Sequence, residues 1–204
     1  MPTEGVIKFQ LEHTPADPLP DNLIAEINPW RKWMYERGLI GIVQIPEGMV
    51  GYGNISLRVE EGFIISGSQT GHLPDLTAEH YAWATAATPE ENRLVSRGPI
   101  KPSSESLTHA VVFEQHPPAR MVMHAHHKGI WLAAERLELP LTSPDAAYGT
   151  VEMAAETTRL FAESNVKEMG IFAMAGHEDG IVTFGESAEQ AAAVMEKYLA
   201  LAGE

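Results

Sequence analysis

The chain has 204 residues, of which 44% are hydrophobic and 21% are charged, so its composition excludes disorder along the whole length. Its 14 Lys and Arg stand against 28 Asp and Glu, a net charge of −14 that argues against general nucleic-acid binding. Any anionic substrate would need a local positive device, such as a metal ion or a helix N-terminus. The absence of cysteine excludes disulfides and thiolate–metal sites. The sequence has no signal-peptide pattern and no apolar run of about 18 residues, so we expect a cytoplasmic protein without a membrane span.

The first half of the chain predicts an N-terminal arm and the start of a single domain. Four prolines make most of residues 1–28 an irregular arm, apart from a short strand at 7–12. The domain is expected to span residues 29–204. Its first elements are predicted as a helix at 28–37, strands at 40–45, 54–60 and 63–67, and a helix at 77–87.

The second half of the chain alternates helices and strands with short connections. Helices are predicted at 103–115, 128–137, 151–164 and from 187 to about 201, and strands at 120–126, 170–175 and 180–184. Many of the connections resemble hairpins. This favours an α/β fold with a mixed or antiparallel sheet flanked by helices over a doubly wound parallel sheet.

His124-Ala125-His126 is the sharpest local feature of the sequence. Residues two apart in a strand share a face, so both imidazoles can approach one metal ion, and imidazole suits zinc among other metals. His127 would point to the opposite face and is left out. Taken alone, the motif more often marks polar histidines at an exposed strand end or hydrogen-bonded histidines in a core.

Glu105 strengthens the metal interpretation. It lies at the start of the helix that precedes the histidine strand, where an acidic side chain also gains from the helix dipole and can complete a cap. Because a tight Pro117-Pro118 turn joins this helix to the strand, the two are predicted to pack antiparallel. Glu105 would then lie near His124 and His126 at one edge of the domain.

Two further histidines are candidates for the same site. His177 lies in a turn directly after an apolar strand, and it is either a third imidazole ligand or a solvated turn residue. His109 follows Glu105 by one helical turn and shares its helix face. It would lie one turn deeper, so we place it behind the ligands.

Five motifs occur in one order along the chain. They are Gly53-Asn54-Ile55-Ser56, Ser68-Gln69-Thr70-Gly71, Pro102-Ser103-Ser104-Glu105, His124-Ala125-His126 and His177. Together they resemble the class II aldolase/adducin family, which includes the L-fuculose-phosphate aldolases. The match runs from about Trp30 to Leu199. No single motif is decisive, but the five in this order are specific.

The resemblance implies a three-layer α/β/α sandwich around a mostly antiparallel sheet, usually assembled as a homotetramer with sites between subunits. It implies zinc held by His124, His126 and His177, with Glu105 as a fourth ligand that can leave the metal. Cobalt or manganese are possible replacements for zinc at such a donor set.

The resemblance also implies a phosphate site formed by Asn54, Thr70, Gly71, Ser103 and Ser104. Hydroxyl groups, an amide side chain, a glycine turn and a helix N-terminus can bind phosphate without bulk positive charge. Either turn motif, if it stood alone, would be ordinary turn chemistry.

The implied activity is that of an aldolase-type lyase that cleaves or forms a C–C bond in a small ketose, expected to be a ketose phosphate. The metal would act as a Lewis acid that stabilises an enediolate, and Glu105 would move the proton. In the family, aldolases carry glutamate after Ser-Ser and the epimerase carries aspartate. The alternatives are a sugar-phosphate epimerase or dehydratase, or a non-catalytic adducin-like assembly module.

The chain departs from the aldolase pattern in two places. The segment between His126 and Tyr148 is shorter, and the part that carries the aldolase's catalytic tyrosine has no counterpart. Residues 43–52 look inserted before Gly53-Asn54. Because of these departures the sequence defines the metal site better than the substrate, and a carboxylate or a bare sugar is an alternative to a phosphate.

Overall fold

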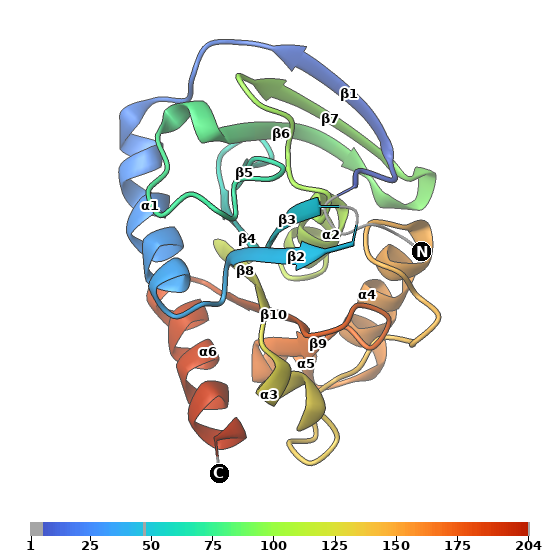
Figure 1. The fold of residues 1–204 in the computed structure, drawn as a ribbon. Helices are drawn as coiled ribbons and strands as arrows, with labels where there is room; N and C mark the ends of the chain where they lie inside the picture. Colours follow the sequence, from blue (N-terminus) through green and yellow to red (C-terminus); the bar gives the residue numbers. More distant parts are fainter. Residues whose placement is uncertain (1–5, 47, 204) are drawn as a thin grey trace.

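The structure of the protein is a computed structural model that describes residues 6–46 and 48–203. Its centre is an eight-stranded β-sheet (Figure 1). The strands follow the order β1-β7-β6-β5-β4-β8-β10-β9 across the sheet. Neighbouring strands of this sheet pair antiparallel except β1 with β7, which confirms the mostly antiparallel arrangement. The strands are β1 (Gln10–Pro15), β4 (Asn54–Arg58), β5 (Phe63–Ser66), β6 (Tyr81–Thr88), β7 (Arg93–Gly98), β8 (Met121–His126), β9 (Ile171–Ala173) and β10 (Gly180–Gly185).

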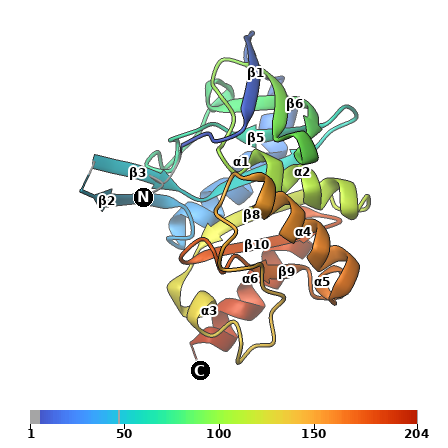
Figure 2. The same ribbon diagram turned by 90° about the vertical axis from the view of Figure 1, so that its right-hand side faces the viewer.

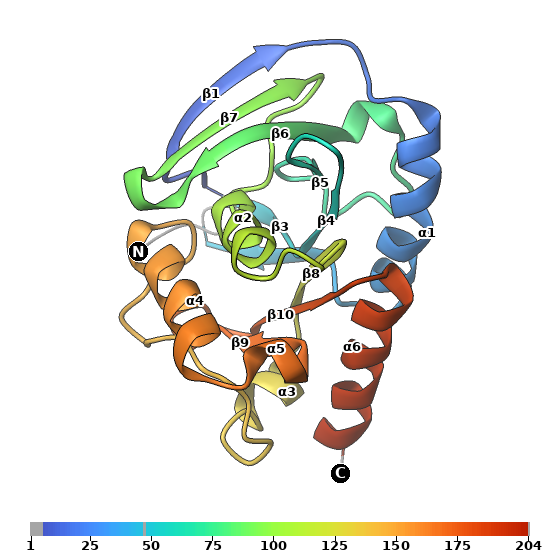
Figure 3. The same ribbon diagram turned by 180° about the vertical axis from the view of Figure 1, so that it is seen from behind.

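Helices cover both faces of the sheet. In Figure 1, α1 (Asp21–Glu36) and α6 (Ala188–Ala202) lie to the left and α4 (Val151–Glu163) lies to the right. Figure 3 shows α4 beside α2 (Ser106–Gln115), with which it is in contact. The short helices are α3 (Lys128–Leu132) and α5 (Val166–Met169). None of the described helices is long and apolar enough to cross a membrane.

The alternation of side chains along β8 divides the core into two layers. Met121 and Met123 pack with α1 and α6, whereas Val122 packs on the opposite face with α2 and α4. This gives the expected α/β/α sandwich. Since His124 has the same parity as Val122, its side chain belongs to the face that α2 covers.

Several predicted elements differ from the observed ones. The helix predicted at 77–87 was wrong, because residues 81–88 form β6, which is hydrogen-bonded between β5 and β7. An alanine-rich segment favours a helix locally, but pairing on both sides overrides that preference. The helix predicted from residue 128 to 137 ends at Leu132. Strand β7 was not predicted.

The N-terminal region is more regular than expected. Residues 10–15 form β1, and α1 begins at Asp21, so the arm boundary placed at residue 28 falls within this helix. Pro29 lies inside α1 instead of in its first turn. Proline lacks the N–H that an interior helix position donates, so an interior proline costs a hydrogen bond. For this reason the sequence predicted that Pro29 lies in the first turn of the helix.

The segment that looks inserted forms a separate hairpin of β2 (Gly41–Ile45) and β3 (Gly48–Tyr52). Figure 2 shows it projecting from the body of the molecule. Its exposed apolar side chains are Ile42, Val43 and Met49. The side-chain oxygen of Gln69 accepts a hydrogen bond from the Gly51 N–H at 2.9 Å, which links the hairpin to the loop after β5.

Gly53 joins the hairpin to β4, directly before Asn54. Its φ of +73° is in the left-handed region, and an added Cβ would lie 2.8 Å from the Leu39 carbonyl oxygen. Gly38 has a similar φ of +69° with nothing within 4 Å of the added Cβ. The two glycines therefore share the same backbone requirement and differ in the space around them.

We expect Gly53→Ala to destabilise the protein more than Gly38→Ala. Both variants incur about 1 kcal/mol for the left-handed backbone, and Gly53→Ala adds about 1–3 kcal/mol of overpacking. Urea unfolding of the two variants and the wild type measures the difference. Equal losses of unfolding free energy would show that the contact with Leu39 carries no strain.

Candidate metal centre

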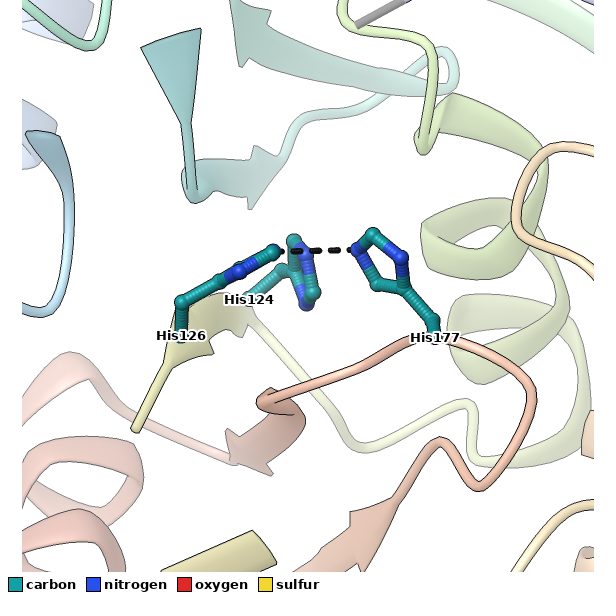
Figure 4. A group of neighbouring side chains, drawn as sticks. All are labelled: His124, His126 and His177. Atoms are coloured by element: carbon teal, nitrogen blue, oxygen red, sulfur yellow. Dashed lines mark hydrogen bonds between the residues drawn. The ribbon is translucent and has the colours of Figure 1, made fainter. Parts of the chain in front are cut away.

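Three imidazoles converge at one edge of the sheet. His124 and His126 lie at the end of β8, and His177 lies in the loop that leads into β10. Because β10 pairs antiparallel with β8, Gly180 lies opposite His126, and the loop before it reaches the same edge. One ligand nitrogen from each residue lies within 4.8 Å of the other two. Figure 4 shows the three rings facing one another, with the His126 and His177 Nε2 atoms 3.0 Å apart.

Burial keeps these imidazoles neutral. His124 and His177 are buried, and burial is the first cause that holds the pKa of each well below its usual value. Burial also lowers the pKa of His126 to about 4. Neutral imidazole is the form that binds metal, so the site is already in its binding state at neutral pH.

A backbone carbonyl orients His124. Its Nδ1 lies 3.2 Å from the Ile181 carbonyl oxygen, which can only accept a hydrogen bond, so we assign the proton to Nδ1. This tautomer leaves the Nε2 lone pair for a metal. Outer hydrogen bonds of this kind are typical of metal-binding histidines.

Glu105 lies beside the three histidines. It occupies the N-cap position of α2 but makes no side-chain capping bond, so the alternative role as a helix cap is not observed. Glu105 as a whole is 3% exposed, with Oε1 3.8 Å from the His177 Nε2 and Oε2 accepting a hydrogen bond from Thr108 at 3.4 Å. The donor set of three neutral imidazoles and one adjacent carboxylate fits zinc.

The other two histidines of the sequence analysis lie outside this cluster. His127 caps α3, where its Nδ1 accepts a hydrogen bond from the Ile130 N–H at 3.1 Å. His109 is fully buried on α2, with Nδ1 2.6 Å from the Ser56 hydroxyl, and burial lowers its pKa to about 3. Its position behind Glu105 is the one expected.

A polar cleft adjoins the metal ligands and collects all five residues predicted to bind phosphate. It is lined by residues 51–54, 67–71 and 103–105 together with His124. The Asn54 side-chain oxygen has no hydrogen-bond partner among the described residues. The cleft therefore places a set of polar groups directly beside the imidazoles.

The hydroxyl groups of the cleft are not equivalent. Thr70 donates its hydroxyl proton to the Gly67 carbonyl oxygen at 2.8 Å, so it holds its own turn together. The Ser103 hydroxyl accepts a hydrogen bond from the Glu105 N–H at 3.2 Å and keeps its own proton for a ligand. While this bond is made, Thr70 has no hydroxyl proton to offer a ligand.

Two tyrosines and a lysine near the centre were not predicted. The Tyr52 ring lies 5.1 Å from the His126 ring, and the Tyr148 ring lies 4.9 Å from the His177 ring. The Lys8 ammonium lies 3.4 Å from the Tyr148 ring centroid and donates to the Tyr148 carbonyl oxygen at 2.9 Å. Lys8 and Tyr148 are 140 residues apart, and no local pattern indicates such a pair.

Comparison with known proteins identifies the family. The model of the class II aldolase and adducin N-terminal domain family matches residues 47–203, and the chain belongs to this family. No curated protein matches. The three-histidine site and the mostly antiparallel sheet agree with membership.

Three solved structures illustrate the likeness of the fold. L-Fuculose-1-phosphate aldolase from Thermus thermophilus is 23% identical, with 90% of this chain and 92% of that chain covered and a TM-score of 0.64. A sugar-phosphate aldolase from Thermotoga maritima is 14% identical, with 89% and 94% covered and a TM-score of 0.64. The class II aldolase domain of a conserved Thermoplasma acidophilum protein is 16% identical, with 92% and 95% covered and a TM-score of 0.59. At these identities, the likeness shows the fold alone.

We expect His124→Ala, His126→Ala and His177→Ala each to abolish stoichiometric zinc binding, because each removes one of the three converging imidazoles. His127→Ala is the matched control, since it removes a neighbouring imidazole that caps α3. Metal content after dialysis against a weak chelator measures the difference. Full zinc occupancy in the His177→Ala protein would contradict the three-histidine site.

Proposed function

We propose that the protein is a metal-dependent, aldolase-type lyase that cleaves or forms a C–C bond in a small ketose phosphate. The observation that carries the proposal is the direct contact between two sites of different chemistry. His124 lines the polar cleft and belongs to the three-histidine cluster. Glu105 lines the same cleft, with Oε1 3.8 Å from the His177 Nε2. A ligand with its anionic group in the cleft would therefore extend its neighbouring oxygen atoms toward the imidazoles.

His124, His126 and His177 would hold the metal, and Glu105 would be a fourth ligand that substrate displaces. Zinc is the expected ion, with cobalt or manganese as replacements. When bound, such an ion supplies Lewis-acid polarisation of adjacent carbonyl and hydroxyl oxygens. The protein's contribution is to keep the imidazoles neutral and the rings aligned.

Glu105 would transfer the proton at the carbon where the bond breaks or forms. Glu105 lines the cleft and its Oε1 lies 3.8 Å from the His177 Nε2, so its carboxylate would reach the reacting carbon of a ketose bound across both sites. Because the side chain does not cap α2, its displacement from the metal toward the substrate would not remove a cap from the helix. A carboxylate in this position can act as acid or base.

The cleft would hold the phosphate of the ketose. Asn54, Ser103, Ser104 and the backbone of Thr70 and Gly71 offer neutral donors next to the N-terminus of α2. Such groups can bind a phosphate in a protein of net charge −14. Holding the phosphate at one end fixes the distance from the metal centre to the reacting carbon.

The assembly and the alternative activities belong to the same proposal. The exposed apolar side chains of the β2–β3 hairpin support a homo-oligomer, which we expect to be a tetramer. An epimerase or dehydratase would use the same metal and cleft, so the site alone does not distinguish these activities. Analysis of the reaction products separates an epimerase or dehydratase from an aldolase. A non-catalytic assembly module has no need of three converging neutral imidazoles.

Glu105→Gln should retain most of the bound zinc. Its turnover rate should be about 10²–10⁴-fold lower than that of the wild type, because the amide cannot transfer the proton. Glu114→Gln, an exposed position on the same helix, is the control. Zinc content and turnover of ketose phosphates are measured on both proteins. Wild-type turnover by Glu105→Gln would rule out the proton-transfer role.

Replacing Ser103 and Ser104 together by alanine should raise KM for a ketose phosphate, with roughly 1–3 kcal/mol lost per charge-assisted hydrogen bond. KM for the unphosphorylated ketose should change little, since that sugar places nothing in the cleft. Steady-state kinetics with both sugars on wild type and variant give the comparison. If both KM values rise alike, the cleft does not bind the phosphate.

A further inference from the structure

Arg31 lies behind the cleft as a buried cation. It belongs to α1 and is 1% exposed. Its guanidinium donates hydrogen bonds to the carbonyl oxygens of Thr70 at 3.0 Å, Gly71 at 3.3 Å and Pro74 at 3.0 Å. The side chain therefore supports the loop that forms one wall of the cleft.

The charge of Arg31 has no acidic partner among the residues that the structure describes. The one carboxylate that influences it, Asp75, is exposed and pairs with Lys32 at 2.8 Å. Its guanidinium contacts neutral groups, namely three backbone carbonyl oxygens and the Tyr35 ring at 5.0 Å. Because a buried charge is costly unless an opposite charge compensates it, an anion nearby would stabilise this arrangement.

Arg31 polarises the peptide unit that joins Thr70 to Gly71. A peptide unit directs its C=O and N–H in opposite directions, so a Thr70 carbonyl that faces Arg31 sends the Gly71 N–H the other way. The Gly71 nitrogen lies close to Gly51. A Cβ added to Gly51 would be 3.1 Å from the Gly71 nitrogen. Both glycines line the cleft. A hydrogen bond from a cation to a carbonyl makes the N–H of the same peptide unit a stronger donor.

We propose that Arg31 is a positioning residue that makes the cleft selective for a doubly charged anion, through the Thr70–Gly71 backbone. The ligand class is a phosphate monoester in preference to a carboxylate or an uncharged sugar. This inference rests on the proposed function for the identity of the ligand as substrate. It goes further by assigning the source of the positive potential to a residue that never touches the ligand.

Binding of inorganic phosphate to the zinc-loaded protein, measured by calorimetry, tests the inference. Arg31→Gln keeps hydrogen-bond donors for the loop and removes the charge, so we expect phosphate affinity to fall about 10-fold to 100-fold. Arg31→Lys keeps the charge and should retain most of the affinity. Arg37→Gln, an exposed position just after the same helix, is the matched control and should bind phosphate as the wild type does.

Selectivity separates this role from a merely structural one. The ratio of kcat/KM for a ketose phosphate to that for the free ketose should fall in Arg31→Gln and recover in Arg31→Lys. Wild-type phosphate affinity in Arg31→Gln would overturn the inference, and so would equal losses in both variants. If neither variant folds, absence of phosphate binding by the wild type at millimolar concentration would overturn it.

The inference and the proposed function fail on different measurements. Loss of phosphate affinity is measured by binding of inorganic phosphate, with zinc content as a check that the metal centre is intact. The lyase proposal depends on turnover and on the Glu105→Gln result. A protein that binds phosphate through Arg31 and turns over no ketose phosphate would refute the second and leave the first standing.

Discussion

The pairing of β8 with β4 on one side and β10 on the other is the constraint on which the site depends. In this register His124 lies opposite Asn54 on β4 and opposite Val182 on β10. A shift of one residue would turn His124 and His126 toward the face that α1 and α6 cover. The same pairing brings the His177 loop to the edge and supplies the Ile181 carbonyl that orients His124. The metal ligands are therefore held by backbone hydrogen bonds of the sheet.

Electrostatics explains why the site contains few formal charges. The protein carries a net charge of −14, yet the cleft beside the metal centre is lined largely by neutral donors. Buried neutral donors are less costly than buried ions, and they gain strength where water is excluded. In the arrangement that we propose, the metal ion and the Arg31 guanidinium both supply positive potential to the ligand, and no cation at the surface is needed.

The sequence predicted the parts of the site that depend on local pattern. The His124 and His126 strand, the adjacent helix and the antiparallel sheet follow from periodicity and from the short Pro-Pro turn, which together placed Glu105 near the imidazoles. The features that were missed depend on contacts distant in sequence. The composition of residues 81–88 favours a helix, and only their pairing with strands on both sides makes them a strand. The sequence around Arg31 gives no sign that this residue is buried, because the loop near Thr70 that covers it is 39 residues away in the chain.

The observed contacts also indicate which part of the site is free to differ from that of the aldolases. Strand β8 holds His124 and His126, and the loop before β10 holds His177. The cleft is built largely by loops, including Gln69 with a φ of +62°. The β2–β3 hairpin, which looks inserted from the sequence, reaches the cleft through Gly51 and lies beside His126 through the Tyr52 ring. A change in this hairpin therefore alters the surroundings of the substrate while the sheet keeps the metal ligands in place. For this reason we expect differences in substrate to arise from the hairpin and cleft, with the metal chemistry unchanged.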